Sequence, residues 1–227
     1  MKTKPNLFQI HKDGYLFVCI FAIVTAFLGI IWGPLGWIGI ILTLWCIYFF
    51  RDPDRVIPLG NYILSPADGV VSKITTVAIP KELKMGDEKV IRISIFLNIF
   101  NVHVNRAPAE GKITKVLYHP GKFFNASLDK ASVHNERNHV AMKLSNGKSL
   151  IFTQIAGLIA RRIVCEVDQD QKIKAGERYG LIRFGSRVDV YLPKGEIPAV
   201  LEKQKVLAGE TILAKIGSKE IMKGSIR

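Results

Sequence analysis

The stretch HVAMKLSNGKSLIFTQIAG, residues 139–157, carries the plainest secondary-structure signal in this sequence. Apolar and polar side chains alternate on both sides of Asn146-Gly147, and β-branched residues are frequent. Alternation with a period of two is typical of a half-buried strand, and Asn-Gly is a strong signal for a two-residue hairpin turn. The stretch therefore predicts a β-hairpin.

Strand patterns of the same kind fill most of the chain after Ile57. They include YILSPADGVVSKITTVAI (62–79) and KVIRISIFLNIFNVHVNRAP (89–108). The phrases KIKAGERYGLI (172–182) and KVLAGETILAKI (205–216) resemble each other and the turns of biotinyl and lipoyl carrier domains. We therefore expect a mainly β fold, a barrel-sandwich-like antiparallel β domain with internal pseudo-symmetry, joined to an N-terminal hydrophobic helical hairpin.

The hairpin accounts for most of the apolar excess of the chain. Two apolar segments, Tyr15–Trp32 and Trp37–Phe50, are separated by Gly33–Gly36, where we expect the turn. The first is just long enough to cross a hydrocarbon core of about 30 Å, and the second is shorter. The sequence predicts a membrane-associated hairpin that either spans the bilayer or enters one leaflet. A buried hairpin of a soluble protein is the alternative.

Basic residues flank this hairpin at both ends: Lys2, Lys4, Lys12, Arg51 and Arg55. Positive flanks mark the cytoplasmic side, so we expect both ends at the cytoplasmic face of a cell membrane, in a bacterium the inner membrane. The predicted organisation is a basic cytoplasmic leader at 1–13, the membrane-associated hairpin at 14–50 and a β-rich catalytic domain at 51–227.

The chain as a whole is strongly basic. Its 227 residues include 32 Lys and Arg against 19 Asp and Glu, a formal net charge of +13 that calls for a polyanionic partner. No nucleic-acid-binding motif is present, so anionic membrane lipid is the expected partner, with about 1 kcal/mol gained per basic residue near the surface. Cys19, Cys46 and Cys165 lack metal-ligand spacing, and we expect neither a metal site nor a disulfide framework.

Three stretches carry polar residues that could act in a site. Asp68 lies in a Pro/Gly turn at a strand start, where aspartate often caps the turn instead. His103 and Arg106 lie near the end of an apolar strand, where a histidine is more often a hydrogen-bonded core residue than a catalyst. The segment 118–140 suits an anionic amphiphile, although a solvated loop would look similar. Its aromatic and basic side chains include His119, Phe123, Phe124, His134 and His139.

A fourth stretch, RYGLIRFGSRVDVYLP (178–193), holds Gly185-Ser186 at the mouth of a strand-like run. Glycine there fits a β-bulge or a tight turn. A serine-hydrolase elbow needs Gly-x-Ser-x-Gly between a strand and a helix, and neither the spacing nor the following strand fits. A third interpretation is that the Gly185-Ser186 peptide bond is itself the reactant.

Taken together, these stretches resemble the phosphatidylserine decarboxylase proenzymes, specifically the short type. The resemblance covers Phe50 to about Leu207 and includes the hydrophobic N-terminal segment. One such phrase would be a weak signal, whereas six in family order are specific. The phrases are FFRDP, SPADGVV, SIFLNIFNVHVNR, YHPGKFFNA, HNERN and RFGSRVDVYLP.

The resemblance implies self-cleavage between Gly185 and Ser186, giving a β chain of residues 1–185 and an α chain of residues 186–227. Attack of the Ser186 hydroxyl on the Gly185 carbonyl would turn the amide into an ester, and β-elimination and hydrolysis would then leave a pyruvoyl group derived from Ser186. A Schiff base between this covalent cofactor and phosphatidylserine would supply the electron sink for loss of CO₂, giving phosphatidylethanolamine. The implied enzyme is a pyruvoyl-dependent carboxy-lyase.

The family uses an Asp–His–Ser arrangement for self-cleavage, which carries over to Asp68, His103 and Ser186. Longer members have two histidines spaced H-x-x-H before a proline, and here Arg106 stands where the second would be. His103 is therefore the expected catalytic histidine. A base elsewhere, such as His119 or His134, and cleavage driven by backbone strain remain open.

A second departure from longer members is Arg187, which stands where they have threonine after Gly-Ser. A guanidinium can bind a lipid phosphate or a substrate carboxylate bidentately. The expected substrate-binding residues are Arg187, Arg106, Phe123, Phe124 and His119.

The implied partners are phosphatidylserine, anionic membrane lipid and, within the mature enzyme, the two chains of a β–α heterodimer. A higher oligomer is left open, and no nucleic acid is expected. Two alternatives from other classes predict an intact chain. One is a non-enzymatic membrane-anchored carrier or adaptor domain on the same barrel-sandwich, and the other is a membrane serine hydrolase using Ser186, His103 and Asp68.

Overall fold

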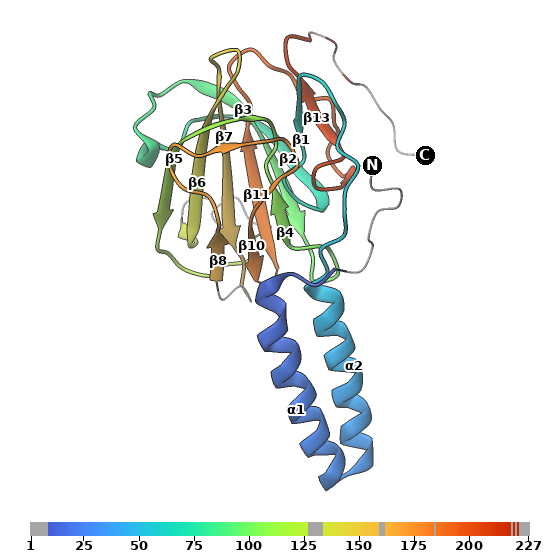
Figure 1. Ribbon diagram of the computed structural model, residues 1–227. Helices are drawn as coiled ribbons and strands as arrows, with labels where there is room; N and C mark the ends of the chain where they lie inside the picture. Colours follow the sequence, from blue (N-terminus) through green and yellow to red (C-terminus); the bar gives the residue numbers. More distant parts are fainter. Residues whose placement is uncertain are drawn as a thin grey trace.

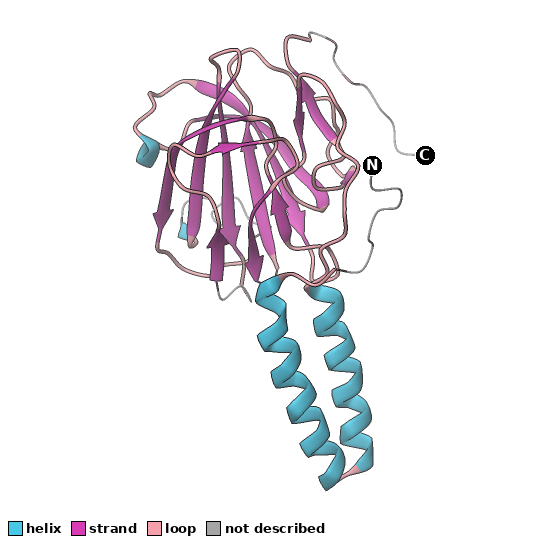
Figure 2. Cartoon of the chain, viewed as in Figure 1, coloured by secondary structure: helices cyan, strands magenta, loops and turns pink. Residues whose placement is uncertain are grey.

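The computed structural model describes residues 9–126, 134–158, 162–183, 185–218, 220 and 222. Of the leader expected at 1–13, residues 1–8 lie outside this described part. Two long helices project together from one end of a β domain (Figure 1). Apart from short helical turns, the rest of the described residues form strands and loops (Figure 2). The predicted mainly β domain with an N-terminal helical hairpin is therefore confirmed.

The hairpin consists of α1 (Tyr15–Ile31), preceded by the 3-10 turn Lys12–Gly14, and α2 (Gly33–Phe49). The expected turn at Gly33–Gly36 is wrong, because these residues form the first turn of α2. Trp32, the single residue between the two helices, has an extended backbone with φ −159° and ψ 119°. Pro34 fits the first helical turn because the N–H that it lacks would have no partner there.

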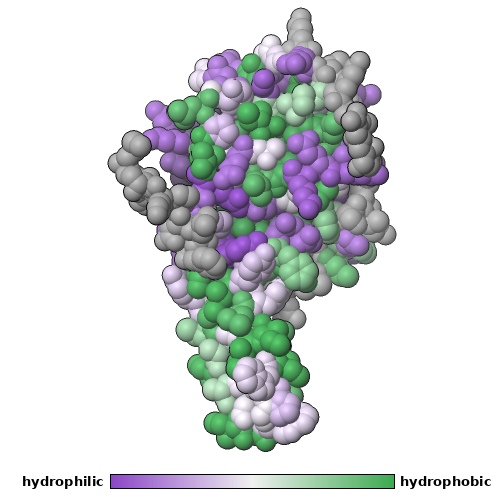
Figure 3. All heavy atoms as spheres, turned by 90° about the vertical axis from the view of Figure 1, so that its right-hand side faces the viewer, coloured by the Kyte–Doolittle hydropathy of each residue, from purple (hydrophilic) through white to green (hydrophobic). Residues whose placement is uncertain are grey.

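Small residues allow the two helices to pack closely. A Cβ on Gly36 would lie 2.8 Å from the Cα of Gly29, and Thr25 and Thr43 hydrogen-bond across the pair at 3.0 Å. Much of the outward surface of the hairpin is hydrophobic (Figure 3). Among the described helices, Lys12–Ile31 is long and apolar enough to cross a membrane, whereas α2 is shorter.

The β domain is built on an antiparallel sheet of eight strands in the order β12-β2-β3-β11-β7-β6-β5-β9. Two smaller sheets, β1-β13 and β4-β10-β8, complete it. In chain order the strands are β1 (Tyr62–Leu64), β2 (Gly69–Ala78), β3 (Lys89–Leu97), β4 (Val104–Arg106), β5 (Gly111–His119), β6 (Arg137–Leu144), β7 (Ser149–Ala156), β8 (Arg162–Cys165), β9 (Lys172–Ile173), β10 (Arg178–Arg183), β11 (Ser186–Tyr191), β12 (Lys205–Val206) and β13 (Ile212–Lys215).

The strand order of the large sheet is consistent with two related halves. They run inward from the two edges as β12-β2-β3-β11 and β9-β5-β6-β7. The two similar phrases each begin with a two-residue strand at an edge of this sheet, β9 or β12, and end in a smaller sheet. Their glycines, Gly176 and Gly209, both have φ +77° and both lie against Ile57. The predicted internal pseudo-symmetry is therefore present in the strand arrangement. The main core consists of buried side chains such as Ile63, Ile93, Ile95, Phe152, Val188 and Leu213.

The hairpin predicted around Asn146-Gly147 is present as β6–β7, but its turn is longer than two residues. Lys143 pairs with Ser149, and the amide of Leu144 donates to the carbonyl of Lys148 at 2.9 Å. Gly147 takes the left-handed conformation, with φ +81°. Loops of three residues with one residue in the left-handed conformation are the next most common hairpin connection after two-residue turns.

Candidate active site

Ser186 is the first residue of β11, a central strand of the large sheet. It pairs with Leu97 of β3 on one side and with Ala156 of β7 on the other. Its side chain is fully buried, and Oγ has no hydrogen-bond partner among the described residues. A buried hydroxyl without a partner costs about 1–3 kcal/mol, so it calls for an explanation, of which a functional role is one.

The residue before it, Gly185, is in the left-handed region with φ +55°. Its carbonyl group faces Gly157, the residue that follows β7. A Cβ built on Gly157 would lie 2.1 Å from the carbonyl oxygen of Gly185 and 3.0 Å from its carbon. Only a glycine at position 157 leaves room for this approach, so Gly157 helps to set the position of that carbonyl group. Gly157 is not among the site residues predicted from the sequence.

His103 is buried in the short connection between β3 and β4. Its Nδ1 lies 3.0 Å from the carbonyl oxygen of Asn101, which can only accept, so Nδ1 carries the proton. Nε2 then has a free lone pair, and it has no partner among the described residues. Burial lowers the pKa of His103 to about 4, so the ring is neutral near pH 7. Nε2 of His103 is therefore free to accept a proton from a neighbouring group.

Asp68 is held by two partners at the start of β2. Its carboxylate accepts two hydrogen bonds from Arg55, at 2.9 and 2.8 Å, and one from the amide of Ala208 at 2.8 Å. Arg55 appeared in the sequence analysis only as a flanking charge. Without knowledge of the fold, nothing in the sequence links it to an aspartate 13 residues away.

The fold brings these three residues to the same end of the β domain. Val70, two residues after Asp68, pairs with Phe96, and the next residue of β3 is the partner of Ser186. The carbonyl of His103 accepts from the amide of Ile182, near the end of β10. The ring of His103 lies 4.3 Å from that of Phe49, the last residue of α2. This is the end from which the helices project (Figure 1).

The two arginines expected to bind substrate are both engaged in buried ion pairs. Arg187 bonds to Asp189 at 2.9 Å and donates to the carbonyl of Ala126 at 3.0 Å. Because side chains alternate along a strand, Arg187 lies on the face of the sheet opposite Ser186. Arg106 donates to Asp52 at 3.0 Å and to the carbonyl of Gly176. Their role in binding substrate stays a prediction.

The other expected binding residues lie in and beside the segment that follows β5. His119 ends β5, Phe123 is exposed, and Phe124 makes an edge contact with His134. The part of the segment at 127–133 lies outside the described residues. The role of these three residues in binding substrate also stays a prediction.

Asn135, which the sequence analysis quoted only within the phrase HNERN, fixes this segment to the sheet. Its fully buried side chain donates to the carbonyls of Phe124 and Ala156, both at 2.7 Å, and accepts from the amide of Phe124 at 3.0 Å. Ala156 is a direct strand partner of Ser186. Asn135 therefore ties the segment after β5 to the strand beside Ser186.

The opposite face of the sheet holds a histidine much like His103. His139 is buried, its Nδ1 lies 2.8 Å from the hydroxyl of Thr153, and burial lowers its pKa to about 4. Its Nε2 also has no partner among the described residues. Because Thr153 pairs with Asp189, His139 lies on the Arg187 face, away from Ser186. It provides a matched comparison for His103.

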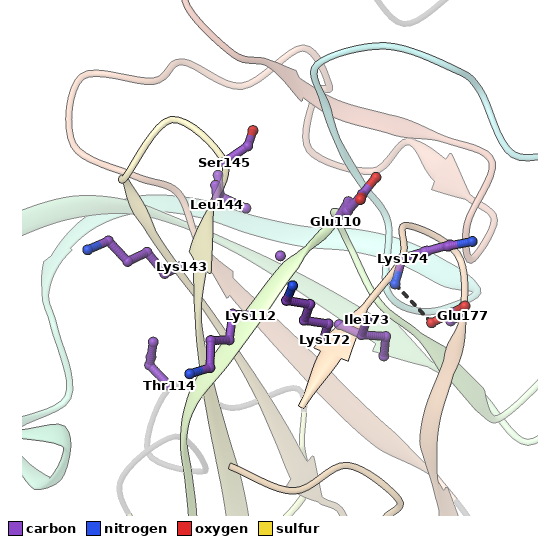
Figure 4. A pocket seen from close by; sticks show the side chains of 11 residues that line it. Glu110, Lys112, Thr114, Lys143, Leu144, Ser145, Lys172, Ile173, Lys174 and Glu177 are labelled. Atoms are coloured by element: carbon purple, nitrogen blue, oxygen red, sulfur yellow. Dashed lines mark hydrogen bonds between the residues drawn. The ribbon is translucent and has the colours of Figure 1, made fainter. Parts of the chain in front are cut away.

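A cavity of about 730 Å³ lies at the other end of the domain, where β5 begins and β6 ends. Lysine and glutamate side chains surround it (Figure 4). Gly111, the first residue of β5, lines this cavity, and Gly69 is the first residue of β2 in the other half of the sheet. The cavity is therefore the pseudo-symmetric counterpart of the Asp68 region, and Ser186 does not line it.

Comparison with known proteins identifies the family. A family model described as phosphatidylserine decarboxylase matches residues 42–214. This chain belongs to the phosphatidylserine decarboxylase family. A phosphatidylserine decarboxylase proenzyme of Rickettsia bellii is 56% identical over 222 residues, which cover 97% of this chain and 96% of the relative. The proenzymes of Rickettsia typhi and Rickettsia prowazekii are each 54% identical, with the same coverage.

Membership in the phosphatidylserine decarboxylase family confirms the resemblance found in the sequence, and the match extends well beyond the six phrases. Because the relatives are similar over almost the whole chain, the helical hairpin lies within the shared region.

Proposed function

We propose that this protein is a phosphatidylserine decarboxylase proenzyme that matures by cutting its own chain between Gly185 and Ser186. The observation that carries the proposal is the environment of Ser186. Its buried hydroxyl has no partner among the described residues and follows directly after a left-handed glycine. Ser186 is also the first residue of β11 and precedes no helix, which is unlike the nucleophile of an esterase elbow.

In the first step, Nε2 of His103 takes the proton of the Ser186 hydroxyl, and Oγ attacks the carbonyl carbon of Gly185. The proton then passes to the amide nitrogen, the C–N bond breaks, and an ester joins the two halves. The neutral state of His103 supports this role, because a protonated ring could not act as the base. Asp68, which forms an ion pair with Arg55, is by family resemblance the third member of the Asp–His–Ser arrangement.

In the second step, loss of the Cα proton of Ser186 expels the Gly185 carboxylate from Cβ. The resulting dehydroalanine rearranges to an imine, and one water converts it to a ketone with release of ammonia. The pyruvoyl group so formed supplies the electron sink that loss of CO₂ from an amino acid requires. The buried position of Ser186 suits such a group, since it limits access of water to the reacting atoms.

The two products of the cut have reason to stay together. β11, at the start of the new α chain, pairs along its whole length with β3 and β7 of the β chain. The mature enzyme is then a heterodimer of its own fragments. The apolar hairpin supports membrane association, and it leaves the domain from the end that carries Ser186 (Figure 1). A lipid substrate would therefore reach the site from the bilayer.

Denaturing mass spectrometry of the purified protein tests the proposal. We expect a fragment that ends at Gly185 and a fragment that begins at position 186, blocked at its amino terminus and one ammonia lighter than simple hydrolysis predicts. Ser186→Ala should remain a single chain without decarboxylase activity. An active protein that remains intact and reacts with a fluorophosphonate would support a serine hydrolase instead, and an intact, inactive wild type would support a carrier or adaptor.

His103→Gln and His139→Gln separate catalysis from packing, because both histidines are buried and neutral. We expect His103→Gln to reduce decarboxylation by about 100-fold or more, the usual worth of a general base. His139→Gln should retain most activity. Equal losses in the two variants would contradict the role of His103.

A further inference from the structure

Two large apolar side chains lie exposed at the end of the domain that carries Ser186. Phe100 is 58% exposed and follows β3, and Leu158 is 68% exposed and follows β7. These are the two strands that pair with β11, so the residues after each partner of Ser186 present an apolar side chain to the surroundings. Strands two apart in a sheet are separated by about 10 Å, so the two side chains flank the Ser186 strand.

Phe100 and the end of β10 are both bonded to residues at the ends of the hairpin. Arg51, directly after the last turn of α2, donates to the carbonyl of Phe100 at 2.8 Å and to that of Tyr48. On the other side, Arg183 at the end of β10 bonds to Asp13, which precedes α1, at 3.3 Å. These contacts fix the Ser186 end of the domain against the two ends of the hairpin that connect to it.

This connection determines what these apolar side chains face. The helical segment Lys12–Ile31, which includes the 3-10 turn before α1, is 20 residues long, and at about 1.5 Å per residue this corresponds to about 30 Å, the thickness of a hydrocarbon core. When the hairpin is inserted, its domain-side ends lie at the level of the lipid headgroups. Phe100, whose carbonyl is bonded to Arg51 at the end of α2, then lies close to this level, and Leu158 follows the strand on the other side of β11.

We propose that Phe100 and Leu158 insert into the membrane surface and form the two sides of the route by which a phospholipid passes from the bilayer to Ser186. The proposal rests on the proposed function, since it concerns delivery of the lipid to that same site. It assigns the bilayer as the occupant of this surface. An aromatic and an aliphatic side chain on adjacent loops are suited to the boundary between headgroups and acyl chains.

The test compares one enzyme on two substrates. One is phosphatidylserine in vesicles with phosphatidylglycerol, and the other is a short-chain phosphatidylserine dissolved as monomers. Each of Phe100→Ser and Leu158→Ser should lower turnover of the vesicle substrate by about tenfold, the equivalent of losing one buried apolar side chain. Turnover of the dissolved substrate should change by about twofold or less. Phe100→Leu, which keeps an apolar side chain at this position, should turn over the vesicle substrate at close to the wild-type rate.

Leu59→Ser is the matched control, because Leu59 is 93% exposed and lies in the connection between α2 and β1, not after β3 or β7. It should leave both activities unchanged. Equal losses on both substrates, or no loss on vesicles, would overturn the proposal. Fragment analysis of every variant distinguishes this from failure of the proposed function, in which case the wild type itself would neither cleave nor turn over the dissolved substrate.

Discussion

The approach of Gly157 to the carbonyl of Gly185 makes a direct prediction about single residues. Gly157→Ala would introduce a Cβ only 2.1 Å from that carbonyl oxygen, so the carbonyl group must move. Since attack by Ser186 requires a well-defined geometry, we expect self-cleavage to slow by about tenfold or more. The measurement is the fraction of cleaved chain against time after synthesis.

Gly111→Ala is the control for this substitution. Its Cβ would meet the carbonyl oxygen of Lys143 at 2.5 Å, a similar clash at the far end of the sheet. Both variants should lose thermal stability, but only Gly157→Ala should cleave slowly. If cleavage slows equally in both, Gly157 acts through general stability and not through the position of the carbonyl group.

At this scale, the residue types of the site could be predicted from the sequence, but their partners could not. The family phrases identify Ser186, His103 and Asp68 as candidates. Pairing of Asp68 with Arg55 depends on how two distant segments fold together. The period of two along a strand already implied that Arg187 and Ser186 lie on opposite faces, and the sequence analysis did not use this signal.

Among the elements, the segment between β5 and β6 depends most on one side chain. Asn135→Ala would remove three hydrogen bonds and leave two backbone groups of the half-buried Phe124 and the buried carbonyl of Ala156 without these partners. We expect a loss of about 2 kcal/mol in the free energy of unfolding, together with slower self-cleavage. Chemical denaturation of the uncleavable Ser186→Ala background measures the first, and the cleavage time course measures the second.

Asn138→Ala provides the comparison for Asn135, since Asn138 is also buried and donates to Gln154 at 3.2 Å. Its substitution should affect stability but leave cleavage close to the wild-type rate. A normal cleavage rate in Asn135→Ala would contradict the inferred role of the segment.

The elements themselves were largely predictable, whereas their ends were not. Alternating apolar residues located the strands, and continuous apolar runs located the helices. Gly33–Gly36 carries the composition of a turn but begins α2, because proline and glycine are tolerated in a first helical turn. The turn after β6 exceeds two residues because Asn-Gly also fits longer hairpin loops.

For the whole molecule, the two buried histidines predict how stability depends on pH. Both have a pKa of about 4 in the folded protein against an ordinary value of 6.5. The unfolded chain therefore takes up protons below pH 6.5 that the folded protein does not, and the free energy of unfolding falls as the pH drops towards 4. We expect a loss of about 2 kcal/mol per histidine between about pH 7 and about pH 5.

Urea unfolding of Ser186→Ala in mild detergent, at about pH 7 and about pH 5, measures this dependence. Adding His139→Gln should remove roughly half of it, because one of the two histidines whose pKa is lowered to about 4 is gone. An unchanged difference between the two pH values would show that other groups cause it.

The sequence predicted the overall architecture and its internal symmetry, but the symmetry did not predict where the helices attach. The similarity of residues 172–182 and 205–216 indicated two related halves, and the strand order has that pattern. Sequence similarity alone did not reveal which end of the sheet faces the helices. That asymmetry arises from contacts of the hairpin with one end only, such as the packing of Phe49 on His103.

The pairing of β11 with strands on both sides has a consequence for the lifetime of the protein. Before the proposed cut, folding is a first-order process within one polypeptide. After it, recovery from unfolding requires two separate chains to meet, so refolding becomes second order and slows as the protein is diluted. Persistence of the mature protein then depends on how rarely the sheet opens, and not on an equilibrium between folded and unfolded states.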